Sequence, residues 1–207
     1  MKLLPLKKEG ISTESFLFKQ GTAISEADQR IWNALRDGNR KALDYIFEKY
    51  VKLLYAYGGK ITKDQGIVED AIQDLFVELW QKHVMLGPTD NIKFYLLKSL
   101  RRRITRRLAT DQRKLGDHNL QEDYSREVEF SMESAIIEQQ TSFAQQEQLT
   151  RGISKLSDRQ REAIYLKFYE KMSYEQLAEV LDISLTSTYK LIGKAVDSLR
   201  KSVRIIY

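Results

Sequence analysis

The feature that most limits the fold of this chain is a pair of helix-capping motifs in its C-terminal part. Ser157-Asp-Arg-Gln160 and Ser173-Tyr-Glu-Gln176 each place a serine three residues before a glutamine. In such a capping box the serine hydroxyl accepts from the N3 amide, and the glutamine side chain reaches back to the serine amide. Two helix starts so close together predict short helices that are joined by tight turns.

The second capping box opens a pattern that is typical of a helix-turn-helix. A short helix with apolar residues at 177, 178, 180 and 181 is followed by the tight connection 182–184. A final helix is predicted from about Leu185 to Ser202, with an apolar face formed by Tyr189, Ile192, Val196 and Leu199. A short helix, a three-residue turn and a longer helix describe a helix-turn-helix. Tyr189 suits either a buried position or a DNA contact, and both interpretations stay open.

Helical periodicity also governs the first half of the chain. Apolar residues recur at i, i+3 and i+4 over about 31–36, 42–57, 67–83 and 91–112, which predicts four helices. Gly58-Gly59 is expected to end the second of them. The 207 residues include only two prolines and 10 glycines, too few for the many turns of an all-β domain. We therefore expect an all-α protein.

Charge divides the chain into blocks. Residues 93–114 carry nine Lys/Arg and one acid, whereas 115–147 carry eight acids and one Arg. Residues 151–207 are again basic, with eleven Lys/Arg against seven acids. We expect two small helical domains that are joined by a flexible acidic linker. The predicted boundaries are an N-terminal extension over 1–27, a first domain over 28–113, the linker over 114–131 and a second domain over 132–207.

Several function classes are excluded by residues that the chain lacks. It has no cysteine and only two histidines, His83 and His118, which excludes a disulfide framework and a thiolate zinc site. Asp70 and Asp74 could share a Mg²⁺ on one helix, but two carboxylates are a thin site. We expect no metal, no cofactor and no enzymatic activity. Apolar runs of about five residues are too short to span a membrane, and the N-terminus does not resemble a signal peptide, so we expect a cytoplasmic protein.

Two stretches resemble a known family. Residues 156–181, which contain both capping boxes, resemble region 4 of bacterial RNA polymerase sigma factors. The stretch Glu69-Asp-Ala-Ile-Gln-Asp-Leu-Phe-Val-Glu-Leu-Trp80 resembles region 2.2 of the same family, and residues 94–114 fall where regions 2.3 and 2.4 would lie. Regions 1.1 and 3 are missing, which is typical of the extracytoplasmic-function (ECF) group. The resemblance covers about residues 28–113 and 132–204.

The resemblance implies an alternative sigma factor that binds core RNA polymerase and directs it to promoter DNA. Region 2 would open and read the −10 element, and region 4 would read the −35 element. Regulation by an anti-sigma factor, often membrane-bound, is also implied. Asp70, Gln73 and Asp74 would contact the coiled-coil clamp helices of the largest polymerase subunit, although the same stripe could be a solvated face. The alternative function is a helix-turn-helix transcriptional regulator that does not bind core polymerase.

The same resemblance assigns candidate DNA contacts. The loop from Leu86 to Asn91 is the candidate site for a flipped base. The helix that follows it would contact the −10 region through Lys98, Arg101, Arg102 and Arg106. The −35 contacts would be Arg159, Arg161, Thr186, Ser187, Tyr189, Lys190 and Lys194. The sequence departs from the usual pattern at Arg102, where many members have Asn, and at Leu191, where Arg is common.

A net charge of +8 within 22 residues requires compensation, because unpaired like charges repel. DNA phosphates are one compensating partner, and their neutralisation makes the affinity salt-dependent. The acidic linker is another. We hypothesise that Glu122, Asp123, Glu127 and Glu129 shield the basic helix in the free protein. The simpler alternative is a linker that only keeps the chain in solution.

Overall fold

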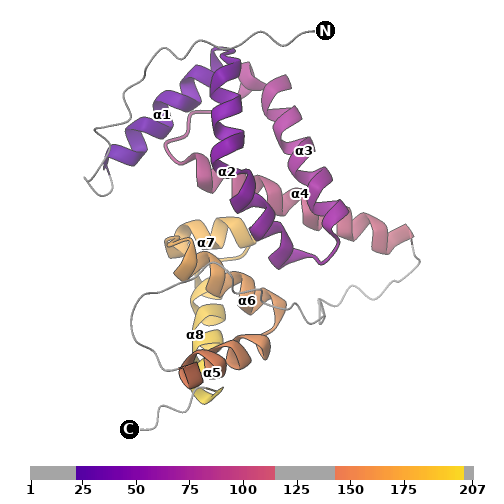
Figure 1. Cartoon of the computed structure of the whole chain (residues 1–207), viewed down its shortest axis with the longest axis vertical. Coiled ribbons are helices and arrows are strands. Elements are labelled where there is room, and N and C mark those ends of the chain that lie inside the picture. Colours follow the sequence, from indigo (N-terminus) through magenta and orange to yellow (C-terminus); the bar gives the residue numbers. More distant parts are fainter. Residues whose placement is uncertain (1–21, 115–142, 203–207) are drawn as a thin grey trace.

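The computed structural model describes residues 22–114 and 143–202, and all regular elements within these ranges are helices. The first range contains α1 (Thr22–Arg36), α2 (Arg40–Ile61), α3 (Gln65–Gln81), the 3₁₀ turn η1 (His83–Met85) and α4 (Ile92–Lys114). The second contains α5 (Phe143–Ser154), α6 (Asp158–Ile164), the π-helical η2 (Tyr165–Tyr169), α7 (Tyr174–Leu181) and α8 (Leu185–Ser202). The all-α prediction is confirmed. Figure 1 shows two groups of helices stacked along the long axis, with α7 next to the first group.

The first helix begins earlier than the sequence pattern predicts. α1 starts at Thr22, within the predicted extension 1–27, and runs to Arg36. It ends at the predicted turn, where Gly38 adopts a φ of +81° that a residue with a Cβ rarely adopts. Asn39 then caps α2 by accepting a hydrogen bond of 3.0 Å from the Lys41 amide. Most of the extension and of the predicted linker lies outside the described residues.

The prediction that α2 ends at Gly58-Gly59 is wrong, since the helix continues to Ile61. Gly58 is buried, and a Cβ added to it would lie 2.4 Å from Cγ1 of Val68 on α3. This glycine therefore allows α2 and α3 to pack closely. Gly59 faces open space, with nothing within 4 Å of an added Cβ.

α3 presents the predicted apolar stripe to the core. Asp64 caps it by accepting from the Ile67 amide at 3.1 Å, which satisfies one of the amides that a helix start leaves without a partner. Its stripe packs against α2 and α4; the buried residues are Val68, Ala71, Ile72, Leu75, Phe76 and Leu79. Fully burying a side chain as large as Val, Leu or Ile stabilises the fold by about 1.5–3 kcal/mol.

A buried acid fixes the start of α4, the basic helix. Asp28 on α1 accepts a hydrogen bond of 3.1 Å from the Ile92 amide and a longer one, 3.5 Å, from the Tyr50 hydroxyl. Lys49 Nζ lies 3.4 Å from the same carboxylate. Burial, reinforced by the Asp28 charge, raises the pKa of Tyr50. Asp28 thus orients the helix that carries the candidate −10 contacts, although its place on α1 gave no sign of this in the sequence.

Both predicted capping boxes form in the second group of helices. Ser157 and Ser173 each exchange hydrogen bonds with the glutamine three residues later, which starts α6 and α7. α7 ends at Leu181, and the left-handed backbone of its C-cap Asp182 (φ 54°) makes the tight turn into α8. The helix-turn-helix is therefore present as predicted.

Candidate nucleic-acid interface

The basic helix α4 divides its cations between two environments. Its apolar stripe, including Leu97, Leu100 and Ile104, is fully buried in the core. Arg102 and Arg106 are exposed, whereas the Arg101 side chain is only 16% exposed. The four predicted −10 cations of α4 are thus not equivalent, because Lys98 and Arg101 face the C-terminal group of helices.

Arg101 forms a buried ion pair with Glu162 on α6. Its Nε lies 2.9 Å from Glu162 Oε1, and the same oxygen accepts a hydrogen bond of 2.7 Å from the Tyr57 hydroxyl. Burial raises the pKa of Tyr57 well above its usual value, and the Glu162 carboxylate adds to the effect. Burial disfavours the charged guanidinium of Arg101, but Glu162, helped by Tyr57 and Asp182, offsets this, so that the pKa of Arg101 is raised.

Two further ion pairs join α4 to the C-terminal helices. Lys93 Nζ lies 3.1 Å from Glu170 Oε2 and donates to the Glu170 carbonyl at 3.0 Å. The second carboxylate oxygen of Glu170 accepts from the Tyr165 hydroxyl at 2.8 Å. Lys98 pairs with Glu179 of α7 at 2.8 Å, in an exposed position. Three of the cations on α4 therefore bind carboxylates that come from beyond residue 143.

The loop before α4 is fixed at both ends. Trp32 Nε1 donates to the Gly87 carbonyl at 2.8 Å, and Asn91 accepts from the Phe94 amide at 2.9 Å as a cap of α4. Leu86, the candidate position at a flipped base, is half-buried against the core. Val84 and Met85 are 74% and 86% exposed just before the loop, and the sequence prediction does not single them out as exposed apolar residues. Their position beyond the apolar stripe of α3 is the sequence feature that could have indicated this exposure.

The predicted polymerase-facing residues of α3 lie on one exposed face, but two of them already have a partner. Arg107 of α4 bridges Asp70 at 2.7 Å and Asp74 at 2.6 Å. The hydrogen bond that Arg107 donates to Asp70, together with the one it donates to Asp74, raises the pKa of Arg107 despite some desolvation. No group of three His, Cys, Asp or Glu in the described residues could hold a metal ion. The guanidinium of Arg107 therefore lies between Asp70 and Asp74, where the sequence alone would allow a Mg²⁺ ion.

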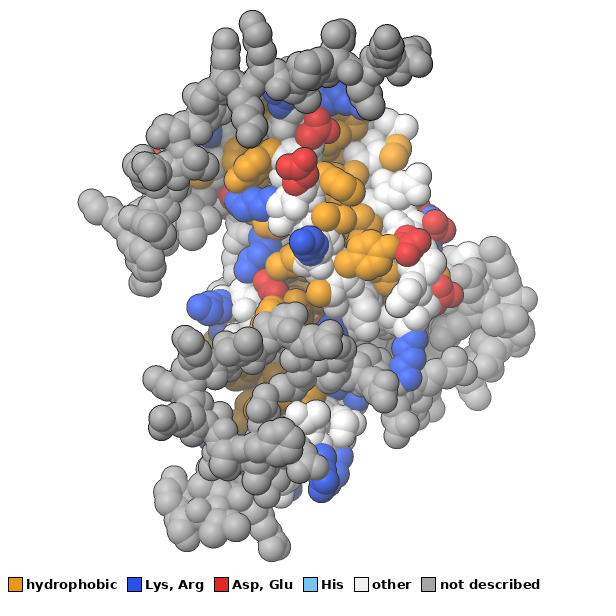
Figure 2. Space-filling model, in the orientation of Figure 1, with side chains coloured by type: hydrophobic (Ala, Val, Ile, Leu, Met, Phe, Trp, Pro, Cys, Tyr) orange, Lys and Arg blue, Asp and Glu red, His pale blue; other side chains and the backbone are white. Residues whose placement is uncertain are grey.

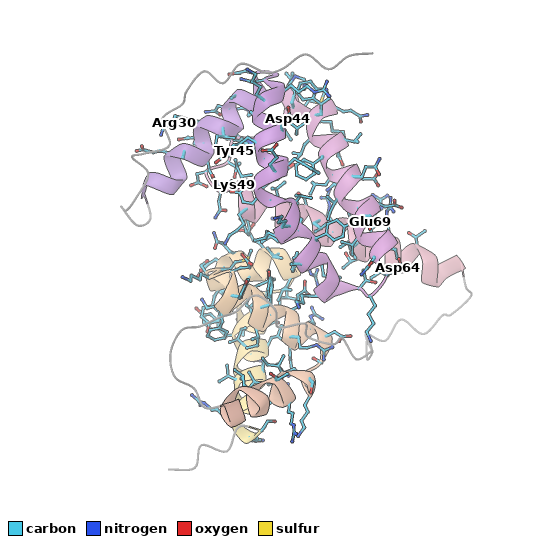
Figure 3. The ribbon with its side chains drawn as sticks, in the orientation of Figure 1. Arg30, Asp44, Tyr45, Lys49, Asp64 and Glu69 are labelled. Carbon is cyan, nitrogen blue, oxygen red and sulfur yellow. The ribbon has the colours of Figure 1, made fainter. Side chains whose placement is uncertain are left out.

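Gln73, the third residue of that face, lines an apolar groove of about 560 Å³ between α2 and α3. Figure 2 shows hydrophobic side chains gathered over these two helices. The groove is lined by Leu43, Phe47, Val51, Tyr55, Ile72, Phe76, Val77 and Trp80, with Arg40, Glu69, Gln73 and Gln81 as its polar residues. Figure 3 labels Glu69 on α3, one turn beyond the cap Asp64. Glu69 raises the pKa of Tyr55 through a side-chain hydrogen bond.

The first turns of α8 are exposed, as a recognition helix requires. Thr186, Ser187, Tyr189, Lys190 and Lys194 are all exposed, whereas Thr188 between them is fully buried. The Tyr189 ring is 50% exposed and stacks on Tyr174 of α7, with 4.1 Å between the ring centroids. Lys167 Nζ lies 4.2 Å from the centroid of Tyr174 on the same column. The open question of whether Tyr189 is buried is thereby answered, since half of its surface faces out.

The two arginines predicted before the helix-turn-helix differ. Arg161 is buried (6% exposed) and donates to the Leu156 carbonyl at 2.9 Å. It also pairs with Asp158 in its own helix. It also donates to the Ser154 carbonyl at 3.3 Å, so its guanidinium joins the end of α5 to α6, and we leave it out of the DNA contacts proposed below. Arg159 is half-buried on the same helix.

Helical packing, a basic helix and an exposed recognition helix define a two-module DNA-binding protein. Two family models match the chain, Sigma-70 region 2 over residues 46–114 and Sigma-70, region 4 over residues 146–199. Together they span more than half of the chain. It belongs to the sigma-70 family, whose members direct promoter recognition, and it carries regions 2 and 4. This is a family of initiation factors and not of enzymes.

Solved structures of similar fold are sigma factors in complexes. The sigma factor RpoE from Bartonella quintana, in complex with the anti-sigma factor NepR, has a TM-score of 0.57 and is 19% identical; the match covers 81% of this chain and 99% of RpoE. CnrH, in complex with the cytosolic domain of CnrY, has a TM-score of 0.52 and is 18% identical, with 84% and 96% covered. No curated protein matches the chain. Within the described residues, none of the helices has the length and apolar character to cross a membrane.

Proposed function

We propose that this sigma factor docks on core RNA polymerase through α3, contacts the −10 region through α4 and the preceding loop, and contacts the −35 element through α8. The observation that carries the proposal is the order of two exposed surfaces along the matched regions: the face of α3 within region 2, and the first turns of α8 within region 4. The roles of individual residues follow from their place on these surfaces.

The docking surface combines charge with apolar area. Asp70 and Asp74 offer carboxylates to a basic partner helix, and Gln73 connects them to the apolar groove between α2 and α3. Interfaces commonly surround an apolar centre with polar residues that set orientation and steer association. We assign this combined surface to core polymerase. The Arg107 bridge keeps the two carboxylates on the exposed side of α3, where a basic partner could compete for them.

For the −10 region, the exposed guanidinium groups of Arg102 and Arg106 are the first phosphate contacts, and Lys98 and Arg101 join them once region 4 moves away. Arginine suits this role because its planar fork binds phosphate through two hydrogen bonds. Leu86 and Asn91 flank the loop that would receive an unstacked base. Holding a base outside the stack costs a few kcal/mol, which fixed loop ends help to offset by lowering the entropy lost on binding.

For the −35 element, Thr186, Ser187 and Tyr189 lie on the first turns of α8, where a recognition helix meets base edges. Lys190 and Lys194 extend this surface with positive charge, and Arg159 adds to it from α6. The aromatic ring of Tyr189 offers apolar contact to a thymine methyl, whereas the hydroxyls of Thr186 and Ser187 can donate to or accept from either base pair.

Partners and location follow from this function. A sigma factor works where the polymerase is, so we place the chain in the cytoplasm and assign it no catalytic step. The RpoE and CnrH structures are complexes with NepR and with the cytosolic domain of CnrY. We extend this to an anti-sigma partner for the present chain, with no assignment of its identity.

Run-off transcription with purified core polymerase and a promoter library tests the proposal. We expect initiation that depends on this protein, at promoters that share a two-part motif. Matched variants assign the surfaces: Asp70→Asn with Asp74→Asn should reduce core binding, while Arg102→Ala with Arg106→Ala should reduce initiation and leave core binding intact. If core polymerase does not bind the wild-type chain at all, the docking surface is wrong and a helix-turn-helix regulator becomes the better account.

A further inference from the structure

We propose that region 4 carries a phosphate-mimicking face, made of Glu162, Glu170 and Glu179, that binds α4 in the free sigma factor and competes there with promoter DNA. We call these three residues the carboxylate face. The inference rests on the proposed function, because it takes α4 as a DNA-binding helix. It goes further by naming what occupies that helix when no polymerase is bound.

The pairing is specific on each cation. Glu162 binds Arg101, Glu170 binds Lys93, and Glu179 binds Lys98, at 2.9, 3.1 and 2.8 Å. A phosphate offers the same ligand, an anionic oxygen within hydrogen-bond distance of a guanidinium or an ammonium. The side chain of Arg101 is only 16% exposed in this arrangement, so a DNA phosphate cannot reach it until Glu162 leaves.

Two tyrosines hold the inner carboxylates in place. The Tyr57 hydroxyl donates to Glu162 Oε1 at 2.7 Å, and the Tyr165 hydroxyl donates to Glu170 Oε1 at 2.8 Å. Each of these buried carboxylates therefore has one cationic and one phenolic partner, which matches the rule that buried charges are paired and hydrogen-bonded. The rings of Tyr57 and Tyr165 also stack, with centroids 6.2 Å apart.

This contact also answers part of the charge problem of α4. Carboxylates of α3 pair with Arg103 and Arg107, and the carboxylate face of region 4 pairs with three more of the nine cations. The shielding hypothesis had assigned this task to Glu122, Asp123, Glu127 and Glu129, which lie outside the described residues. Arg102 and Arg106 remain exposed on α4. A first contact with DNA can therefore form before region 4 leaves.

The contact between the carboxylate face and α4 is suited to reversible opening. Removing two charges from water costs free energy, and their mutual attraction offsets only part of this cost. A buried ion pair therefore fixes which groups meet without making the association of the two regions strongly favourable. The exposed pair between Lys98 and Glu179 adds little. A competitor that offers α4 several phosphates at once replaces all three carboxylates, which a single soluble anion does not do.

The test uses the full chain with the carboxylate face neutralised, Glu162→Gln with Glu170→Gln and Glu179→Gln. The control carries the same change in net charge at exposed positions away from α4, Glu26→Gln with Glu48→Gln and Asp197→Asn. Since the chain has no cysteine, Asp44→Cys on α2 and Lys201→Cys on α8 give a unique pair of sites for fluorescent labels. Energy transfer between the labels reports whether the two groups of helices separate. Binding to a duplex of mixed sequence, without polymerase, reports whether α4 is accessible.

We expect the neutralised variant to lose energy transfer and to bind DNA about tenfold more tightly than the wild type, because cations released from the carboxylate face become phosphate contacts. The control variant should do neither. Adding Lys98→Ala and Arg101→Ala to the neutralised variant should remove the gain, which assigns it to the released cations of α4.

Two results overturn the proposal. Energy transfer that is unchanged by neutralisation means that the carboxylate face does not hold the domains together. Separation of the labels without tighter DNA binding means that the face does not mask α4. The proposed function is judged separately: if Arg102→Ala with Arg106→Ala leaves run-off transcription unchanged in an otherwise wild-type chain, α4 is not the −10 surface.

Discussion

The Tyr57 hydroxyl donates a hydrogen bond of 2.7 Å to Glu162, which lies 105 positions further along the chain. Tyr57 lies on α2 within region 2, whereas Glu162 lies on α6 within region 4. The same carboxylate oxygen receives Arg101 from α4. One buried carboxylate of region 4 therefore joins two helices of region 2.

This relationship predicts alkaline sensitivity. Burial and Glu162 raise the pKa of Tyr57 above that of an unfolded tyrosine, about 10. Above pH 10 the unfolded chain releases this proton while the folded chain keeps it, so the stabilisation is complete below pH 10 and declines as the pH rises. Urea unfolding at several pH values should show a steeper loss for wild type than for Tyr57→Phe, by about 1.4 kcal/mol per pH unit for one proton. Equal slopes would mean that Tyr57 ionises as freely in the folded chain.

The adjacent glycines of α2 make a matched pair for a packing test. Gly58→Ala places a Cβ 2.4 Å from Val68 Cγ1, so we expect a loss of about 1–3 kcal/mol from overpacking. Gly59→Ala meets nothing within 4 Å and should stabilise the exposed helix by up to ~1 kcal/mol. Thermal unfolding of the two variants should therefore shift in opposite directions. Val68→Ala should restore part of the loss in Gly58→Ala, and a loss that persists in full would point to another cause.

The local features of this fold were readable from the sequence, and the long-range ones were not. Ser157 and Ser173 announced their helices because a capping box is complete within four residues. Gly58 was misread as a helix end, since the close approach of Val68 depends on how α2 meets α3. The place of Arg161 on the helix before the helix-turn-helix suggests a DNA contact, but its burial depends on contacts with the end of α5 and the turn after it, which the sequence does not report. The pairing of Arg101 with Glu162 spans 61 residues, and no periodicity reports a contact at that distance.

The bridge from Arg107 to α3 gives a prediction for polymerase binding. Arg107 holds Asp70 and Asp74 in exposed ion pairs, which are typically worth 0.2–1 kcal/mol. Arg107→Ala frees both carboxylates for a basic partner, so affinity for core polymerase should rise about two- to fivefold. Titration of labelled protein with core polymerase measures this. Arg102→Ala, which removes an exposed cation from the same helix, should leave core affinity unchanged, and weaker binding by Arg107→Ala alone would make Arg107 itself a polymerase contact.

The stack between Tyr174 and Tyr189 predicts how the recognition helix holds its aromatic side chain. The centroids of the two rings lie 4.1 Å apart, and Lys167 Nζ lies 4.2 Å from the centroid of Tyr174. An aromatic pair of this kind is worth about 0.5–1.5 kcal/mol, so its loss should lower affinity for the preferred −35 duplex by about two- to tenfold. Tyr174→Ala removes the stack, whereas Tyr174→Phe keeps the ring and should retain wild-type affinity.

The informative readout is discrimination between −35 sequences, since a general loss of stability lowers binding to all of them alike. With Tyr174→Ala, Tyr189 loses its fixed orientation, and we expect the preferred duplex to lose more affinity than a duplex changed at the contacted base pair. Tyr189→Ala should reduce the same preference, and adding Tyr174→Ala to it should have little further effect, because both changes remove one contact. Strictly additive losses would show that Tyr174 acts on DNA binding by a route other than Tyr189.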